Sequence, residues 1–529
     1  MKLYRIISVA ATASILLAAT SCGDEFLTVD NPTAQPIEEY FTTQEHLTEA
    51  LYAAYDPLEW TDYSSFGGYN PLPLMSDIMA DDIWPGGSDR TDNHYYHLMA
   101  EYASTPTSCM TGLWTIAYSG IKRANDCIKY IGWVDGLSDD IAKSYEAQCR
   151  VLRVYYYSWL WKFWGNVPYY EVNLEDPFVC KQYTADEVYE SMMTDLEGAI
   201  AINALPMKRS GEECGLVTKA MAYMLYAECA MYQKDADRLS KALEYMKEII
   251  SSGSYSLNPS FDAVFSAEGE WCDESIFEIN YRADQSARSW GGSLYAGGTC
   301  IPRLIGPDSW SAGTPANRPH DNGWGFCTVR TATYDMYQDG DTRRDATCWN
   351  ALAVGSYSAR YQDTGLFLEK YVGQTTNSGQ IADGDLNYDK NIRIYRYSET
   401  LLNAAELVIA GYGSGDAAAW INEVHKRAGL SDTVAADLAS VKQERRWEFV
   451  GEGKRYWDLI RWGDAASVLT ADYTNNADRG FTETRSKGKQ FSWKAEAKYL
   501  PIPQSEIDAT AGTEFPMVQN PSTGYVSNE

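Results

Sequence analysis

Apolar side chains recur with the period of an α-helix in two stretches of the chain, at about residues 108–252 and 392–463. The clearest run goes from Asp139 to Trp164 and places its apolar residues on one helix face, with Gly165 at the end and Pro168 just beyond. The same pattern predicts helices over 217–233, 236–251, 392–411 and 417–428. The pattern therefore predicts a mainly α-helical protein.

Two helix starts carry capping boxes, Thr42-Thr-Gln-Glu45 and Thr184-Ala-Asp-Glu187. The predicted helices at 217–233 and 236–251 are joined by a short turn and together have about the length of one tetratricopeptide unit. Helix pairs repeated along a chain bury a continuous core between neighbouring pairs. We therefore expect tetratricopeptide-like helix pairs.

The helical period is absent from about residues 60–96 and 253–390, where Gly, Ser, Asn and Asp are dense and aromatic residues recur. One short run, Ser275–Tyr281, predicts a strand. Irregular segments of this length inside a compact protein are usually functional. We expect a single domain over 42–529, with a large loop-rich ligand-binding region.

Tryptophan and tyrosine in these polar loops are placed as rigid, amphipathic platforms. Sugar rings present apolar C–H faces that stack on such rings, while neighbouring polar side chains bind the hydroxyl groups. The alternative is that some of the rings only pack the loops together. The candidate ligand-binding residues are Trp84, Trp290, Tyr295, Arg303, Trp310, Asn317, Asp321 and Trp324.

The stretch from Glu444 to Gly463 holds nine charged residues and five aromatic ones in twenty positions. A buried ion-pair cluster under aromatic residues is one interpretation, because buried charges need partners. The other is an α-helical glycosidase with Glu448 and Glu452 as acid and base. Arginines close by in sequence should keep both carboxylates ionised, which favours the structural interpretation and a protein that is not an enzyme.

The acidic balance of the chain, a net charge of −29, argues against nucleic acid as a partner, since phosphate recognition needs a basic surface. Ten cysteines other than Cys22 are spread singly, without a dense disulfide framework. Sequence leaves open a few disulfides among Cys272, Cys300, Cys327 and Cys348.

Motifs for common cofactors are not found: no Walker lysine loop, Rossmann glycine pattern, H-E-x-x-H or nucleophile elbow. His94 and His97 are spaced for a shared metal but have no third ligand in sequence. Acidic and amide side chains alternate from Asp383 to Asp389 as in a calcium loop, although Tyr388 and Ile394 replace residues that an EF-hand needs. We expect no cofactor, with an adventitious Ca²⁺ left open.

The N-terminus has a short basic segment and an apolar run that ends at Ala19-Thr-Ser-Cys22. This resembles a bacterial lipobox, which implies a signal peptide over 1–21, cleavage before Cys22 and lipidation of that cysteine. A secretory signal with an incidental cysteine is the alternative. A polar tether over 22–41 is expected, and no later apolar run reaches spanning length. Asp24 and Glu25 resemble the surface-export signal of Bacteroidetes lipoproteins, which implies display on the cell exterior.

The stretch Glu444–Gly463 is also similar to the signature of the SusD/RagB family, outer-membrane nutrient-binding lipoproteins of Bacteroidetes. Further segments resemble the family's motifs. They are Arg153–Tyr157 with Phe163–Pro168, Arg396–Glu406, Ile421–Leu430 (with His425 in place of an arginine), Tyr499–Pro503, and Gln519–Pro521, after which Ser522 and Thr523 interrupt the usual ending.

The resemblance implies a SusD-like fold, tetratricopeptide-like helix pairs with a loop-rich ligand face. It implies an outer-membrane protein, attached to the membrane through its lipid anchor only. It also implies capture of oligosaccharides and their transfer to a SusC-like TonB-dependent transporter, without catalysis. Some members of the family bind peptides instead, so the ligand class stays open.

Overall fold

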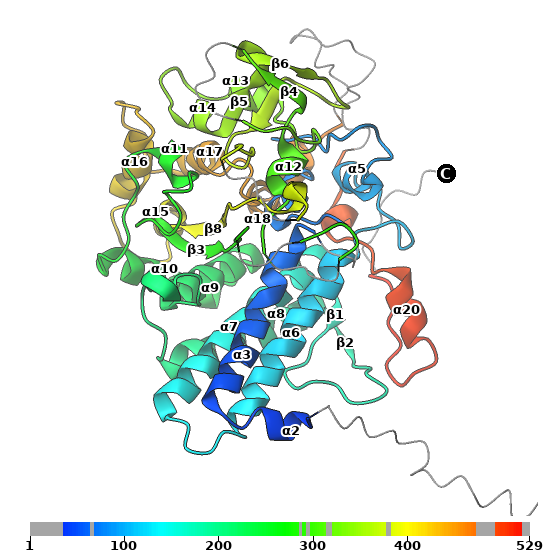
Figure 1. Cartoon of the computed structure of the whole chain (residues 1–529). Coiled ribbons are helices and arrows are strands. Elements are labelled where there is room, and N and C mark those ends of the chain that lie inside the picture. Colours follow the sequence, from blue (N-terminus) through cyan, green and yellow to red (C-terminus); the bar gives the residue numbers. More distant parts are fainter. Residues whose placement is uncertain are drawn as a thin grey trace, which may run out of the picture.

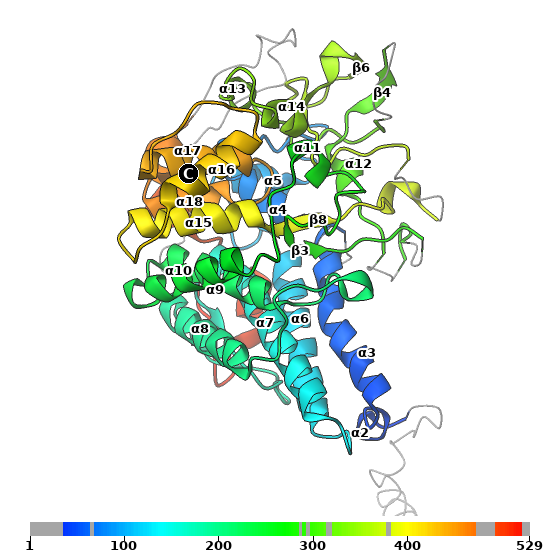
Figure 2. The same cartoon turned by 90° about the vertical axis from the view of Figure 1, so that its left-hand side faces the viewer.

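The computed structural model describes residues 35–63, 68–284, 288–292, 297–313, 320–376, 382–471 and 492–520. Helices provide most of its regular structure, and its strands form small two-stranded sheets. Long helices fill the lower part of the molecule, while short helices, strands and loops fill the upper part (Figures 1 and 2). The predicted mainly α-helical fold is confirmed.

The long helices of the first half pack in antiparallel neighbours. They are α3 (Gln44–Tyr55), α6 (Gly112–Ile131), α7 (Asp139–Trp164), α8 (Ala185–Ile202), α9 (Lys219–Gln233) and α10 (Ala236–Ser251). Helix α6 packs on α3 and α7, α7 on α8, and α9 on α10. Helix α7 has the predicted bounds, and Gly165 ends it at a φ of 72°. A Cβ at Gly165 would lie 2.8 Å from the ring of Tyr499, so glycine is required there.

The helices of the second half are α15 (Tyr397–Ile409), α16 (Ala417–Arg427), α17 (Leu438–Glu448), α18 (Arg455–Trp462) and α19 (Ala465–Val468). Helix α15 packs on α10 and thereby joins the two sets of helices. The predicted helix over 392–411 is wrong at its start. Residues Ile392–Arg396 form strand β8, which pairs antiparallel with β3 (Ser275–Ile279). Three of its five residues are β-branched or aromatic, which suits a strand.

Helices α3 and α8 begin at or next to the capping residues that the sequence predicts. Thr184 and Glu187 form the predicted capping box of α8. For α3 the N-cap is Thr43, one residue later than predicted, and its side chain accepts a hydrogen bond from the backbone N–H of His46. The capping residue is therefore correct in type and wrong by one position.

Short elements make up the loop-rich part and the ends. The helices and 3₁₀ turns are α2 (Ile37–Tyr40), η2 (Asp56–Thr61), α4 (Leu72–Asp77), α5 (His94–Ala100), η3 (Gly211–Glu213), α11 (Phe261–Val264), α12 (Ile301–Ile305), α13 (Thr331–Asp335), α14 (Arg343–Thr347), η4 (Ala351–Ala353), η5 (Gly384–Leu386), η8 (Ala495–Lys498) and α20 (Gln504–Thr510). The remaining sheets pair β1 (Val167–Pro168) with β2 (Gln182–Tyr183), β4 (Asp308–Ala312) with β6 (Gly355–Ser358), and β5 (Cys348–Asn350) with β7 (Leu366–Leu368).

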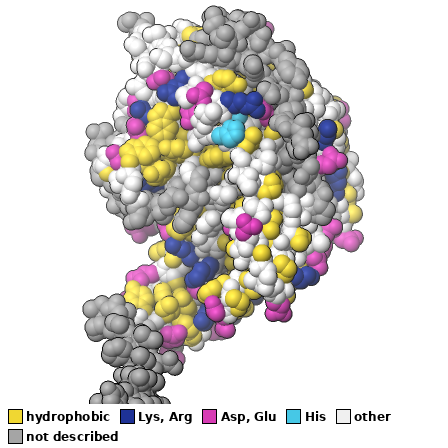
Figure 3. Space-filling view, turned by 90° about the vertical axis from the view of Figure 1, so that its right-hand side faces the viewer, with side chains coloured by type: hydrophobic (Ala, Val, Ile, Leu, Met, Phe, Trp, Pro, Cys, Tyr) yellow, Lys and Arg dark blue, Asp and Glu magenta, His cyan; other side chains and the backbone are white. Residues whose placement is uncertain are grey.

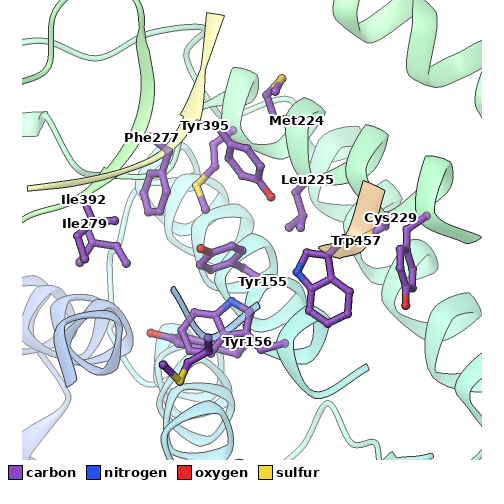
Figure 4. Packing of buried hydrophobic residues seen from close by; sticks show 14 of the residues in the cluster. Tyr155, Tyr156, Met224, Leu225, Cys229, Phe277, Ile279, Ile392, Tyr395 and Trp457 are labelled. Atoms are coloured by element: carbon purple, nitrogen blue, oxygen red, sulfur yellow. The ribbon is translucent and has the colours of Figure 1, made fainter. Parts of the chain in front are cut away.

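One large hydrophobic core runs from Leu47 to Met517. Its centre is rich in tyrosine and tryptophan from both sets of helices and from the β3–β8 sheet, and Tyr155 of α7 meets Tyr395 of β8 edge to face (Figure 4). All ten described cysteines are free thiols, so none of the possible disulfides is present among them. Within the described ranges, no helix has the length and apolar character needed to cross a membrane.

Candidate functional site

Four aromatic side chains from three loops form a closed ring of contacts, which we call the aromatic surface: Tyr63, Tyr69, Trp290 and Trp324. The centroids of Trp290 and Trp324 are 5.9 Å apart, and Tyr63 and Tyr69 lie 5.5 and 5.7 Å from Trp290 and Trp324 respectively. These spacings are those of favourable aromatic pairs. The Trp290 side chain is 46% exposed and the other three are partly exposed.

Asp62 links the loop that carries Tyr63 to the loop that carries Trp290. Its carboxylate, which is fully buried, accepts hydrogen bonds from Nη1 of Arg288 at 2.8 Å and from Oγ1 of Thr299 at 2.7 Å. Tyr63 follows Asp62 directly, and Trp290 comes two residues after Arg288. The Arg288 side chain is also fully buried, so the pair is both desolvated and matched. This ion pair fixes the two rings relative to each other.

The alternating segment Asp383–Asp389 holds the Trp290 loop from the other side. Asp383 accepts a hydrogen bond from the backbone N–H of Trp290 at 2.8 Å. The Asn387 side chain bonds both the N–H and the C=O of Arg288, at 2.9 and 2.8 Å. No group of three or more His, Cys, Asp or Glu in the described parts of the chain is arranged to hold a metal ion. These polar side chains therefore bind the protein's own loops.

The loop that carries Trp324 is fixed by its contact with α12. The Trp324 N–H donates to the carbonyl of Arg303 at 2.7 Å, and a guanidinium N–H of Arg303 donates to the carbonyl of Asn322 at 2.9 Å. Gly306 and Gly323 touch backbone to backbone, since a Cβ at Gly323 would lie 2.2 Å from the Cα of Gly306. Glycine at these positions allows Trp324 to approach the rest of the aromatic surface.

Polar groups border the aromatic surface. The Arg303 guanidinium pairs with Asp385 at 3.1 Å, and Asp321 accepts a hydrogen bond from the Tyr388 hydroxyl at 2.9 Å. Burial raises the pKa of Tyr69, and the neighbouring carboxylate of Asp385 adds to this. The guanidinium at this border is already neutralised by a carboxylate, so the surroundings favour an uncharged ligand over an anionic one.

Trp310 lies in a second, adjacent aromatic group. Its ring meets Trp349 edge to face at 4.8 Å, and His320 stacks on Trp349 at 3.8 Å. The imidazole of His320 also pairs with Glu369 at 3.0 Å. The predicted residues Trp290, Arg303, Asp321 and Trp324 thus come together, whereas Trp310 belongs to a neighbouring group.

Trp84 is placed differently from the prediction. Its side chain is only 3% exposed, and the guanidinium of Arg330 lies 4.3 Å from its ring centroid. The ring faces are covered, so we leave Trp84 out of the site. The predicted residues Tyr295, Asn317 and Cys22, the signal peptide and most of the tether lie outside the described residues.

Tyr63 and Tyr69 are not among the predicted site residues. Both follow the end of η2 in a short glycine- and serine-containing segment, the same composition that marks the tryptophan loops. That shared composition is the signal that could have found them. On the metal prediction, His97 is buried beside Tyr361, and burial lowers its pKa to about 4.

The carboxylates of the alternative catalytic site lie in a buried ion-pair cluster. Glu448 pairs with Arg343, Arg396 and Arg427, and Glu452 pairs with Lys370 at 2.6 Å and with Arg396 at 2.7 Å. Burial raises the pKa of Glu448, but the three guanidinium groups outweigh burial and hold it far below its ordinary value. Glu452 comes from the turn after α17 rather than from the helix itself. A carboxylate held ionised in this way cannot act as a general acid at neutral pH.

The face of the molecule seen in Figure 3 shows no concentrated basic patch among its described residues. In Figure 3 the Lys and Arg side chains lie among Asp and Glu side chains, and hydrophobic side chains gather in the upper part of the view. A mixed surface of this kind gives no electrostatic footprint for a polyanion.

Two family models each match a long stretch of the chain. A model of the SusD family matches residues 328–525, and a model described as "Starch-binding associating with outer membrane" matches residues 25–229. A surface glycan-binding protein A from Bacteroides thetaiotaomicron, solved with laminarihexaose, is 52% identical, with a TM-score of 0.84 over 90% of this chain and 100% of that one.

Two further relatives extend the comparison. The surface glycan-binding protein A from Bacteroides uniformis is 43% identical, with a TM-score of 0.80 over 90% of this chain and 99% of that one. A SusD-like protein from Formosa agariphila is 23% identical over 96% of this chain and 97% of its own length. The similarity therefore covers nearly the whole of each protein.

Proposed function

Because the chain belongs to the SusD/RagB family, we propose that it is a surface glycan-binding lipoprotein that captures oligosaccharides and delivers them, unchanged, to a SusC-like TonB-dependent transporter. The observation that carries the proposal is the aromatic surface. Its rings are held by buried hydrogen bonds and an ion pair, yet Trp290 remains 46% exposed. Rings fixed before the ligand arrives lose little entropy when they bind it.

Charge and similarity support one ligand class. The relative from Bacteroides thetaiotaomicron was solved with laminarihexaose, a neutral oligosaccharide of glucose. The border of the aromatic surface supports a neutral ligand here as well, since Arg303 is already paired with Asp385. We infer that the chain binds glucans of the laminarin type rather than polyuronic acids.

The state of the two carboxylates of the alternative catalytic site supports binding without turnover. Glu448 and Glu452 are buried and paired with cations. Lipidation at Cys22 would anchor the protein in the outer membrane with the aromatic surface on the cell exterior. The family-model description, which includes association with the outer membrane, supports this location.

The test is isothermal titration of the mature protein with laminarihexaose, a starch oligosaccharide, an oligogalacturonate and a mixed peptide. We expect heat only with neutral glucans and strongest binding with laminarihexaose, and no reducing sugar released on long incubation. Binding only to the peptide, or release of sugar, would contradict the proposal.

Delivery needs a separate test. Detergent-solubilised outer membranes should yield the transporter together with the affinity-tagged protein, and a Cys22→Ala variant should be found in the soluble fraction. Recovery of the tagged protein alone would reject the transporter while leaving glycan binding intact.

A further inference from the structure

A cavity of about 550 Å³ opens between α3, the η3 loop and the end of β3. Its lining includes Glu49, Tyr52, Asp56, Glu59 and Glu212. The Tyr52 side chain is 55% exposed, although tyrosine rings elsewhere on α3 and α7 are buried or half-buried. This volume lies in the range of ligand sites in proteins.

The cavity and the aromatic surface share one structural element. Positions 52 and 56 are about one helical turn apart where α3 ends, and α3 continues into η2, which ends two residues before Tyr63. At the rise of an α-helix and then a 3₁₀ turn, Tyr52 and Tyr63 are separated by about 20 Å along this element. The continuous segment of α3 and η2 therefore leads from the cavity to the aromatic surface.

Glu59 is the link between them. It lines the cavity, and its Oε2 accepts a hydrogen bond from the backbone N–H of Gly297 at 2.8 Å. Its backbone carbonyl accepts another from Nη2 of Arg288 at 2.6 Å, so Glu59 touches both ends of the loop that carries Trp290. Glu59 therefore lines the cavity and also holds the loop that carries Trp290.

Two of the carboxylates that line the cavity are paired with arginines. Asp56 pairs with Arg123 at 2.6 Å, and the buried Glu278 pairs with Arg393 at 3.5 Å. Burial raises the pKa of Glu59 to about 7, so this side chain is partly protonated at neutral pH. The charge that remains on Glu49 and Glu212 suits hydroxyl donors of a neutral ligand better than it suits a dedicated cation site.

We propose that this cavity is a second subsite for the same glycan, so that a long chain bound on the aromatic surface continues past Glu59 and stacks on Tyr52. The inference rests on the proposed function. Short oligosaccharides would occupy the aromatic surface, and only longer chains would reach the cavity. Tyr52 supplies a ring face, while Glu49 and Glu212 accept hydrogen bonds from sugar hydroxyls.

The experiment compares laminarihexaose with full-length laminarin on wild-type protein and on Tyr52→Ala and Glu212→Gln variants. Tyr52→Ala should weaken laminarin binding at least about fivefold, as expected for loss of one stacking ring, while the affinity for laminarihexaose stays within about twofold. Phe178→Ala is the matched control, since Phe178 is 68% exposed on a different loop and should change neither affinity.

Each other outcome has a defined meaning. Equal affinities of Tyr52→Ala and wild type for laminarin would overturn the second subsite and leave the proposed function standing. Failure of the wild type to bind either glucan would overturn both. Spermidine serves as a cation probe, and binding of spermidine that Glu212→Gln abolishes, with laminarin unaffected, would make the cavity a cation site.

Discussion

The buried ion-pair cluster around α17 and the aromatic surface are built from the same kinds of residue in opposite arrangements. In the cluster, charges lie inside and aromatic rings cover them, as where the Arg396 guanidinium lies 5.1 Å from the ring of Phe449. In the aromatic surface, rings lie outside and buried charges such as Asp62 and Arg288 support them. The difference teaches that pairing, rather than composition, decides which region is free to bind a ligand.

Energetics make the same distinction. Buried charges lose their hydration, and each must be fully paired in the folded protein. The carboxylate of Glu448 is buried and already pairs with three arginines, so it is not available to a ligand. Exposed rings keep an apolar face in water, which a ligand can cover at little cost.

Breaking the cluster should have the largest effect. Glu448→Ala leaves Arg343, Arg396 and Arg427 without one buried partner, and we expect a loss of about 3–5 kcal/mol in the free energy of unfolding. Urea denaturation measures it. Glu268→Ala, at an exposed position, is the control and should change stability by less than about 0.5 kcal/mol. Equal stability of the two variants would show that the cluster is not a structural unit.

Truncating one buried and one exposed tryptophan sharpens the comparison. Trp84→Ala should lower the free energy of unfolding by about 3–5 kcal/mol and leave the laminarihexaose affinity of the folded protein unchanged. Trp290→Ala should do the reverse, with an affinity loss of about 1–3 kcal/mol, by analogy with base stacking on aromatic rings. Thermal unfolding and titration calorimetry separate the two. If only the Trp84→Ala variant lost affinity for laminarihexaose, the ligand site would lie at Trp84 rather than at Trp290.

Acid should weaken the cluster. Arginines outweigh burial and lower the pKa of Glu448, and the same balance lowers the pKa of Asp81 to about 2. A carboxyl whose pKa is lower in the folded state stabilises the fold above its unfolded pKa, and this contribution is lost as the pH falls through the folded value. The urea midpoint should therefore fall steadily from about pH 5 towards pH 2. A midpoint independent of pH in this range would contradict the ion pairs.

Loosening the Trp290 loop should have a smaller effect. Asp383→Ala removes the acceptor for the Trp290 N–H, and we expect laminarihexaose binding to weaken by about 0.5–1.5 kcal/mol, the value of one hydrogen bond. Asp339→Ala, at an exposed aspartate, is the control. Addition of EDTA should not change the laminarihexaose affinity of either variant. A loss of binding in EDTA would indicate a calcium site at 383–389.

Much of the helical fold can be predicted from the sequence. Helix α7 has the predicted bounds, because its apolar period is long and a glycine ends it. The predicted helix wrongly includes strand β8, because the strand is short and its pairing with β3 joins residues more than a hundred positions apart. A local pattern cannot reveal such a partner.

The site is less predictable than the fold. Polar, glycine-rich loops indicate Trp290 and Trp324, whose rings lie together in the aromatic surface, but they indicate Trp84 as well, although Arg330 covers its ring. The sequence prediction also omits Tyr63 and Tyr69. The residues of the aromatic surface differ from Trp84 in the long-range contacts that hold their loops, and sequence spacing does not contain these contacts. The side chains that make them are Asp62, Asp383 and Asn387.

Hydrogen–deuterium exchange of the wild-type protein with and without laminarihexaose tests the central claim most directly. We predict slower exchange near Tyr69, in 288–292 and in 320–324 when the glycan is bound, and unchanged exchange across 444–463. Protection confined to 444–463, or none in any of these segments under saturating glycan, would contradict the account.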